Sequence, residues 1–204
     1  VCSSDLPSPS LFDSEGLAQA ALEAMADGAQ ALQYGPTEGL PALRELLADL
    51  TRERGMQAQA DDLIVTTGSQ QAFDLIVRVL IEPGDTVLVE VPSYPAALQA
   101  LRLAQARILP VPMDEQGLQT EALAELLRTL PAARRPKLLY TVPNFSNPRG
   151  TLLSADRRAA LVQLARTYGF WIVEDDPYGE LRFDRLDGDA SPMPANLRAL
   201  GEAP

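Results

Sequence analysis

Polar and aromatic residues gather at four points in the sequence where an apolar run ends. The first group, Thr67-Gly-Ser-Gln-Gln71, stands between a predicted strand and a predicted helix. Because glycine lets the backbone approach a ligand closely and a helix N-terminus offers free N–H groups, this group is suited to bind a phosphate. An ordinary strand-to-helix turn with a serine cap has the same residues, so the motif alone does not decide between the two.

The next two groups supply an aromatic ring and side-chain amides. Val91-Pro-Ser-Tyr-Pro95 places Tyr94 just beyond a strand, where the ring either stacks on a ligand or packs in the core. Pro143-Asn-Phe-Ser-Asn-Pro-Arg-Gly150 contains two asparagines and two prolines, which predict a tight loop with its amide groups directed outward. Turn formation explains that loop as well as ligand binding does.

The fourth group, Glu174-Asp-Asp-Pro-Tyr178, puts three adjacent carboxyl groups at the end of an apolar strand. Such charges are unfavourable there unless they are exposed, paired or bound to a ligand. Carboxylates also bind metals, but the other strand ends supply neither a second carboxylate nor a histidine, so we expect no metal site. The stretch Pro112–Gly117, after another strand, has the composition of an ordinary turn.

Together the four groups indicate one kind of ligand. A phosphate cradle, a stacking ring, amide donors and a carboxylate beside a phenol would meet at one edge of a sheet. These groups match a phosphorylated aromatic cofactor with a ring nitrogen and a ring hydroxyl, and pyridoxal 5′-phosphate (PLP) has all of these features. The prediction is therefore a PLP site, with another phosphorylated ligand as the alternative.

The elements that must position these groups alternate along the chain. Apolar runs predict strands at Leu63–Thr67, Thr86–Glu90, Arg107–Val111, Lys137–Val142 and Phe170–Glu174. Helical spacing predicts helices at Ser14–Leu32 with Ser14 as cap, Gly39–Arg54, Gln70–Ile81, after Pro95, Thr120–Leu130 and Ser154–Tyr168 with Gly169 as cap. This pattern predicts an α/β fold: a doubly wound, mostly parallel sheet with helices on both faces. Ligands bind such sheets at the carboxyl ends of the strands, where the four groups lie.

Composition narrows the classes of function. The 204 residues carry a net charge of −11, which disfavours a nucleic-acid groove, and no apolar run is long enough to span a bilayer. The absence of histidine excludes Ser-His-Asp and Cys-His catalysis. The single cysteine, Cys2, excludes an internal disulfide and suits a reducing compartment, so we expect a cytoplasmic protein.

In the order in which they occur along the chain, the motifs at the strand ends resemble those of the fold-type I PLP-dependent aminotransferases of class I and II. The branch that they resemble most is that of the 2-aminoadipate aminotransferases, which includes the aminotransferase-like domains of MocR-type transcription regulators. The resemblance implies transfer of an amino group between an amino acid and a 2-oxo acid by a homodimer. It rests on Tyr34-Gly-Pro-Thr-Glu-Gly-Leu-Pro-Ala-Leu-Arg44, Thr67–Gln71, Pro92–Tyr94, Pro143–Gly150 and Glu174-Asp-Asp-Pro-Tyr-Gly-Glu-Leu181.

The resemblance also assigns residues to the phosphate of the cofactor. It implies that Gly68, Ser69 and Gln70 cradle this phosphate. Tyr34 matches a tyrosine that family members donate to the phosphate in the neighbouring subunit, which is why the resemblance implies a homodimer with shared sites.

Further residues are assigned to the cofactor ring by the same resemblance. Tyr94 would stack on the ring, and Asn147 would bond the region of its hydroxyl oxygen O3′ and orient the substrate carboxylate. Asp175 would pair with the ring nitrogen and Tyr178 would bond O3′, and these two are the catalytic residues that we expect in this chain. Glu174 and Asp176 match no family role and are expected to be structural or solvated.

The sequence departs from the family pattern in two places. Arg149 stands where the family has threonine, which would put a charge near the site. The lysine that forms the Schiff base is absent, and the only lysine, Lys137, begins a strand at the opposite edge of the sheet. A six-residue strand spans roughly 20 Å, too far for this lysine to reach the cofactor. We therefore expect the chain by itself to be inactive.

We expect the sequence to be part of a longer protein. The expected domains are an N-terminal arm and helix (1–33) and a partial PLP-binding large domain (34–204), with the lysine-bearing region and a C-terminal small domain outside it. The resemblance further implies that Leu63–Thr67 pairs with a last strand that also lies outside. The alternatives to an aminotransferase are a PLP-dependent lyase on the same fold and the effector-sensing domain of a MocR-type regulator. We expect no nucleic acid and no membrane as partners of this region.

Overall fold

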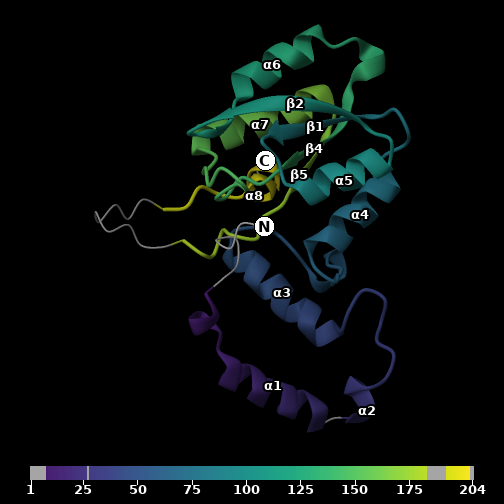
Figure 1. Cartoon of the computed structure of the whole chain (residues 1–204), viewed down its shortest axis with the longest axis vertical. Helices are drawn as coiled ribbons and strands as arrows, with labels where there is room; N and C mark the ends of the chain where they lie inside the picture. Colours follow the sequence, from purple (N-terminus) through teal and green to yellow (C-terminus); the bar gives the residue numbers. More distant parts are fainter. Residues whose placement is uncertain (1–7, 27, 183–191, 203–204) are drawn as a thin grey trace. The chain divides into compact units, whose positions relative to one another are not determined.

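A computed structural model describes residues 8–26, 28–182 and 192–202 of the chain, and Figure 1 shows its elements. The chain divides into two compact units, Val1–Leu40 and Pro41–Pro204. The first unit holds the short 3-10 helix η2 (Pro9–Leu11) and the helices α1 (Ser14–Ala26) and α2 (Gly28–Ala31). The Asp13 carboxylate accepts a hydrogen bond from Gly16 N at 2.9 Å, so Asp13 caps α1 and the prediction of Ser14 as the cap is wrong. The helix predicted at Ser14–Leu32 is two helices, with residue 27 outside the described residues.

The second unit is built on a sheet with the strand order β3-β2-β1-β4-β5. Its strands are β1 (Thr86–Val91), β2 (Arg107–Asp114), β3 (Gly117–Leu118), β4 (Pro136–Thr141) and β5 (Trp171–Glu174). β1 pairs in parallel with β2 and β4, and β4 pairs in parallel with β5. Only the short β3 is antiparallel to its neighbour β2. The mostly parallel α/β sheet that the sequence predicts is confirmed.

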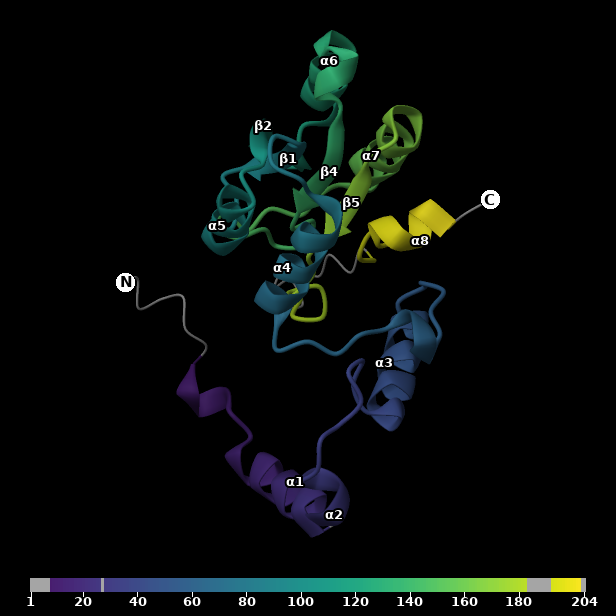
Figure 2. The same cartoon turned by 90° about the vertical axis from the view of Figure 1, so that its right-hand side faces the viewer.

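Helices cover both faces of this sheet (Figure 2). The side chains of the strands alternate between the two faces. On one face, α4 (Ser69–Leu80) and α5 (Pro95–Leu103) pack on Val87, Val89 and Leu138. On the other face, α6 (Thr120–Thr129), α7 (Ala155–Tyr168) and α8 (Leu197–Glu202) pack on Leu88 and Leu139. The remaining elements are α3 (Pro41–Glu53) and the 3-10 helices η3 (Ala60–Asp62) and η4 (Ala132–Arg134).

Three predictions about these elements are corrected by the structure. Leu63–Thr67 is not a strand, because no strand in the described part of the chain lies beside it to accept its hydrogen bonds. Pro112–Gly117 is not simply a turn: β2 continues to Asp114 and forms a hairpin with β3, with Gly117 at a φ of 89°. The helix α8 was not predicted. By contrast, α7 follows Ser154 and ends at Gly169 in the left-handed conformation, as predicted.

None of the helices in the described part of the chain is long and apolar enough to cross a membrane.

Candidate functional site

Four of the predicted ligand residues of the second unit meet at the carboxyl ends of its strands. Ser69, Gln70, Tyr94 and Asp175 line one narrow pocket, together with Phe73, Ala97 and Tyr140. These residues come from the start of α4, the start of α5, the body of β4 and the residue after β5. Four of the residues that the sequence predicts as cofactor ligands are thus brought together from three separate motifs.

The start of α4 has the geometry that a phosphate site needs. Gly68 precedes the helix with φ 80° and ψ 169°, a conformation that is open to glycine and unfavourable for other residues. The first turn of α4, which begins at Ser69, presents backbone N–H groups that have no partner within the helix. The Ser69 and Gln70 side chains are exposed. An anion placed here would meet free donors and the positive end of the helix dipole.

Tyr94 lies directly before Pro95, the first residue of α5. Its ring is half-buried and packs against the same apolar cluster as α4 and α5. The ring therefore packs on the core and also lines the pocket. Its stacking on a ligand stays a prediction.

Asp175 is held by β4 through its backbone and its side chain. Its backbone N–H donates to Thr141 O at 3.0 Å, and its Oδ2 accepts a hydrogen bond of 2.6 Å from the Tyr140 hydroxyl. Tyr140 and Val173 are paired across β4 and β5, so Asp175, two residues after Val173, lies on the same face as Tyr140. Burial, and next the Asp175 carboxylate, raise the pKa of the Tyr140 phenol, which therefore stays protonated.

The other predicted ligands stand outside the lining of this pocket. Tyr178 is half-buried and packs on the same apolar cluster as Tyr94. Asn147 is half-buried in the loop after β4, and its side chain makes no hydrogen bond to the residues that the structure describes. Tyr34 belongs to the first unit and is 99% exposed. Its contact with a neighbouring subunit stays a prediction.

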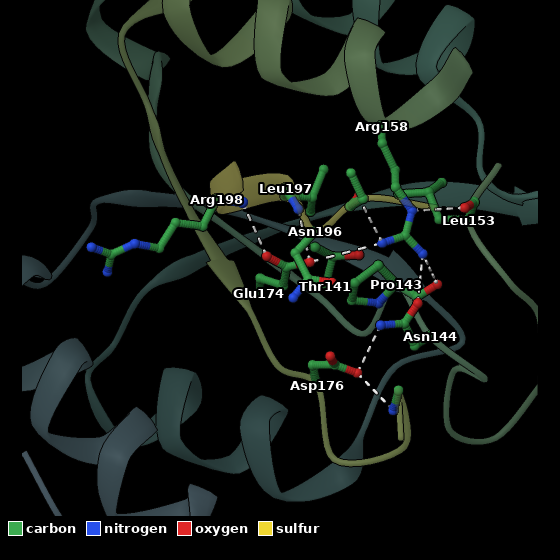
Figure 3. A network of polar contacts seen from close by, with 12 residues as sticks. Thr141, Pro143, Asn144, Leu153, Arg158, Glu174, Asp176, Asn196, Leu197 and Arg198 are labelled. Atoms are coloured by element: carbon green, nitrogen blue, oxygen red, sulfur yellow. Dashed lines mark hydrogen bonds and ion pairs between the residues drawn. The ribbon is translucent and has the colours of Figure 1, made fainter. Parts of the chain in front are cut away.

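The two acidic neighbours of Asp175 are part of a buried network, shown in Figure 3. Asp176 accepts hydrogen bonds from Asn144 Nδ2 (2.8 Å) and Gly179 N (2.9 Å) and forms an ion pair with Arg54. Glu174 accepts bonds from the backbone N–H groups of residues 197 (3.0 Å) and 198 (3.2 Å) at the start of α8. Each of the three acids therefore has its own set of partners. The contacts of Glu174 and Asp176 agree with the structural role expected for these two residues.

The centre of that network is Arg158 of α7, whose side chain is completely buried. Its guanidinium donates to Leu153 O (2.9 Å), Pro143 O (3.2 Å) and Asn144 Oδ1 (2.6 Å), and lies 3.9 Å from Glu174 Oε1. Arg158 thus ties the loop that carries Asn147 to the helix α7.

The two departures from the family pattern lie away from the pocket. Arg149 donates to Met113 O at 3.2 Å and sits among the residues around Asp114, so it does not line the pocket that Asp175 lines. Lys137, the second residue of β4, forms a 2.6 Å ion pair with Asp85, which precedes β1. Its predicted place at the amino ends of the strands is confirmed.

One further acid at this edge, Glu90 of β1, is 1% exposed. It accepts hydrogen bonds from Thr141 Oγ1 (2.7 Å) and Val142 N (3.0 Å). Burial raises its pKa to about 7, and the nearby Asp175 adds to the increase. Glu90 and Thr141 follow Leu88 and Leu139 by two residues, so they lie on the face that α6 and α7 cover.

Sequence reasoning missed the parts played by Tyr140, Glu90 and Arg158. Tyr140 and Glu90 stand inside runs that look like plain buried strands. Their partners are distant in the sequence: Asp175 is 35 residues from Tyr140, and Val142 is 52 residues from Glu90. A signal did exist for Arg158, because it precedes the buried Leu161 and Val162 by three and four residues and so shares their helix face.

The donor set of the pocket fits PLP. A helix start suits the phosphate, a half-buried aromatic ring suits the pyridine face, and a carboxylate with one oxygen still unbonded suits the ring nitrogen. Among the described residues, the side-chain polar atoms of Ser69, Gln70 and Tyr94 likewise have no hydrogen-bond partner, so they are available to a ligand.

Comparison with known proteins gives an independent result. The aromatic-amino-acid aminotransferase 1 of Thermococcus litoralis is 44% identical over 181 residues, covering 87% of this chain and 43% of that protein. The 2-aminoadipate transaminase of Thermus thermophilus is 42% identical over 179 residues, with 87% and 43% covered. A crystal structure of the Pyrococcus horikoshii kynurenine aminotransferase in complex with PMP, KYN and KYA matches with a TM-score of 0.88 at 40% identity, over 97% of this chain and 48% of that one.

The chain therefore spans less than half the length of these relatives. The family model for class I and II aminotransferases matches residues 2–200, which is nearly the whole of the sequence. On this match and on the shared fold, the chain belongs to the class I and II aminotransferases, the fold-type I enzymes that use PLP.

Proposed function

We propose that the protein that contains this chain transfers an amino group between an amino acid and a 2-oxo acid, with PLP as cofactor. The observation that carries the proposal is the shared pocket of Ser69, Gln70, Tyr94 and Asp175. The relatives reported above are all named as aminotransferases, which favours transfer over elimination. Aromatic amino acids, kynurenine and 2-aminoadipate are the substrates that their names suggest for this protein.

Each residue of the pocket has a task in this proposal. Ser69, Gln70 and the backbone N–H groups at the start of α4 bind the phosphate and so fix the position of the cofactor. Tyr94 packs against the ring face and excludes water from it. When bound, the cofactor supplies an electron sink for the bond changes at the α-carbon of the amino acid.

Asp175 holds a proton on the ring nitrogen by accepting its hydrogen bond, which keeps the ring positively charged where electron density arrives. Tyr178 and Asn147 are the proposed donors to the ring hydroxyl. Tyr34 is the proposed contact with the phosphate in a neighbouring subunit, within a homodimer. We also propose that the protein is cytoplasmic. Its N-terminal arm would end at residue 33 and its PLP-binding large domain would begin at residue 34.

Two experiments test the proposal. The first measures binding of pyridoxamine 5′-phosphate to the purified complete protein by equilibrium dialysis. This form of the cofactor has no aldehyde and cannot condense with Lys137. Binding that is weakened at least tenfold by Asp175→Ala and by Tyr94→Ala supports the proposed site, whereas unchanged binding refutes it.

The second experiment measures reactions of the complete protein. With kynurenine, 2-aminoadipate or an aromatic amino acid as donor, product formation should depend on an added 2-oxo acid such as 2-oxoglutarate. Release of ammonia without any need for the 2-oxo acid would indicate the lyase alternative instead.

A further inference from the structure

The Tyr140 hydroxyl is a buried polar group whose partner is the site carboxylate. Tyr140 is 1% exposed and lies in an apolar cluster with Phe73, whose ring centroid is 4.8 Å away. A hydroxyl in such surroundings is unfavourable unless it makes a hydrogen bond. Its partner is Asp175 Oδ2, at 2.6 Å.

This bond completes a two-point attachment of Asp175 to β4. The backbone N–H of Asp175 donates to Thr141 O at 3.0 Å, and the side chain accepts from the residue before, Tyr140. Tyr140 itself is held by the register of β4 against β1 and β5. Both Tyr140 and Asp175 line the pocket, and no described residue donates a hydrogen bond to the second carboxylate oxygen, Oδ1.

We propose that Tyr140 is a positioning residue for the cofactor: by holding Oδ2 of Asp175, it leaves Oδ1 ready to accept the hydrogen bond of the ring nitrogen. This inference rests on the proposed function. A carboxylate that is already held in one orientation loses less side-chain freedom when the cofactor binds, so its bond to the ring nitrogen is stronger. Because burial and Asp175 raise the pKa of Tyr140, the phenol stays a donor throughout the neutral range.

The test compares two ligands that differ in one ring atom. Pyridoxamine 5′-phosphate has the ring nitrogen, and its 1-deaza analogue has a C–H group in that place. The binding of each ligand to the complete wild-type protein and to its Tyr140→Phe and Asp175→Ala variants is measured by equilibrium dialysis. Tyr168→Phe is the matched control, because it removes the same atom from a tyrosine that packs in the cluster on the opposite face of the sheet.

Tyr140→Phe should weaken binding of pyridoxamine 5′-phosphate about tenfold, the usual effect of one hydrogen bond to a charged group. It should change binding of the deaza analogue less than about twofold, and Tyr168→Phe should change neither. In the Asp175→Ala background, Tyr140→Phe should have no further effect on either ligand. The proposal is overturned if Tyr140→Phe weakens binding of both ligands equally or weakens binding of neither, since the hydroxyl would then not act through Asp175.

The outcomes for the proposed function are separate. If the complete wild-type protein binds both ligands equally and Asp175→Ala changes neither affinity, the cofactor assignment fails and the inference fails with it. If Asp175→Ala weakens binding of pyridoxamine 5′-phosphate more than binding of the deaza analogue, but Tyr140→Phe does not, only the inference fails.

A measurement on the wild-type chain covers the case in which Tyr140→Phe does not fold. The Tyr140 hydroxyl proton, protected by burial and by its bond to Asp175, should give a proton NMR signal that Asp175→Ala abolishes. Pyridoxamine 5′-phosphate should shift this signal more than the deaza analogue does. Equal shifts with the two ligands overturn the proposal.

Discussion

Replacing Glu90 by glutamine should stabilise the second unit at neutral and alkaline pH. Glu90 is 1% exposed and has a pKa of about 7, raised from 4.5 mainly by burial. Glutamine has the same shape and carries no charge. Its oxygen can still accept the hydrogen bond of Val142 N, and its amide can donate to Thr141 Oγ1 in place of the bond that Glu90 accepts.

The sign of the effect follows from where the proton binds. Between pH 4.5 and 7 the folded chain holds the Glu90 proton more tightly than the unfolded chain does, so the free energy of unfolding falls as the pH rises. The difference of about 2.5 pKa units between the folded and the unfolded chain means that ionised Glu90 lowers the free energy of unfolding by about 3 kcal/mol. This loss of stability is fully present above pH 7 and absent below pH 4.5. Glu90→Gln should therefore equal the wild type at pH 4.5 and exceed it by up to about 3 kcal/mol at pH 8.

Urea unfolding followed by far-ultraviolet circular dichroism, at several pH values from 4.5 to 8.5, measures this difference. The matched control is Glu53→Gln, because Glu53 is exposed on α3 and its change should alter stability by less than about 0.5 kcal/mol at every pH. A difference between Glu90→Gln and the wild type that does not depend on pH would refute the reasoning. So would a loss of stability at pH 8, which would mean that the Glu90 charge itself stabilises the fold through Thr141 and Val142.

Three further substitutions test other parts of the site. Asp175→Ala in the complete protein should lower kcat about a thousandfold or more, since it removes the charge that holds the ring nitrogen protonated, and a loss below about tenfold in a steady-state assay would contradict that role. Gly68→Ala should destabilise the chain by about 1–3 kcal/mol in urea, because the φ of 80° is unfavourable for alanine although no atom lies within 4 Å of the added carbon, and it should weaken pyridoxamine 5′-phosphate binding in dialysis. Arg158→Leu should lower the free energy of unfolding by about 3 kcal/mol or more, since Asn144 Oδ1 and nearby carbonyls lose their buried donor. Arg78→Ala, at an exposed ion pair, is its control and should change stability by less than about 1 kcal/mol.

Much of the second unit could be predicted from the sequence because its signals are local. Glycine at 68 and 169, the proline that opens α5 and the apolar runs of the parallel strands each act through their own few residues. The rule that ligands bind at the carboxyl ends of parallel strands then joins distant motifs without any knowledge of their contacts. That is why the motifs at the strand ends could be assigned to one site before their positions were known. The resemblance to the PLP-dependent aminotransferases then singled out Ser69, Gln70, Tyr94 and Asp175 within them.

The rest depends on which residues face each other across strands, and no local signal carries that. Leu63–Thr67 has the composition of a strand, yet a strand exists only where a neighbour accepts its hydrogen bonds. In the same way, a tyrosine in an apolar run becomes a partner of Asp175 only through the register of β4 against β5. The partners of Arg158 include Asn144, in the loop after β4, and Ala195, before α8, which are 14 and 37 residues away in the sequence.

Strand β4, which lies between β1 and β5, explains how several acids come to stand together at one sheet edge. Residues at its end alternate between the two faces, and they give a hydrogen bond to each acid in turn: Tyr140 to Asp175, Thr141 to Glu90, and Asn144, just beyond the strand, to Asp176. Charges so close together would repel one another unless donors from the protein compensated them or a proton neutralised one. Burial first, and Asp175 to a lesser extent, raise the pKa of Glu90 to about 7, which favours its neutral form. Of these three acids, only Asp175 lines the pocket, so the site presents a single carboxylate to its ligand.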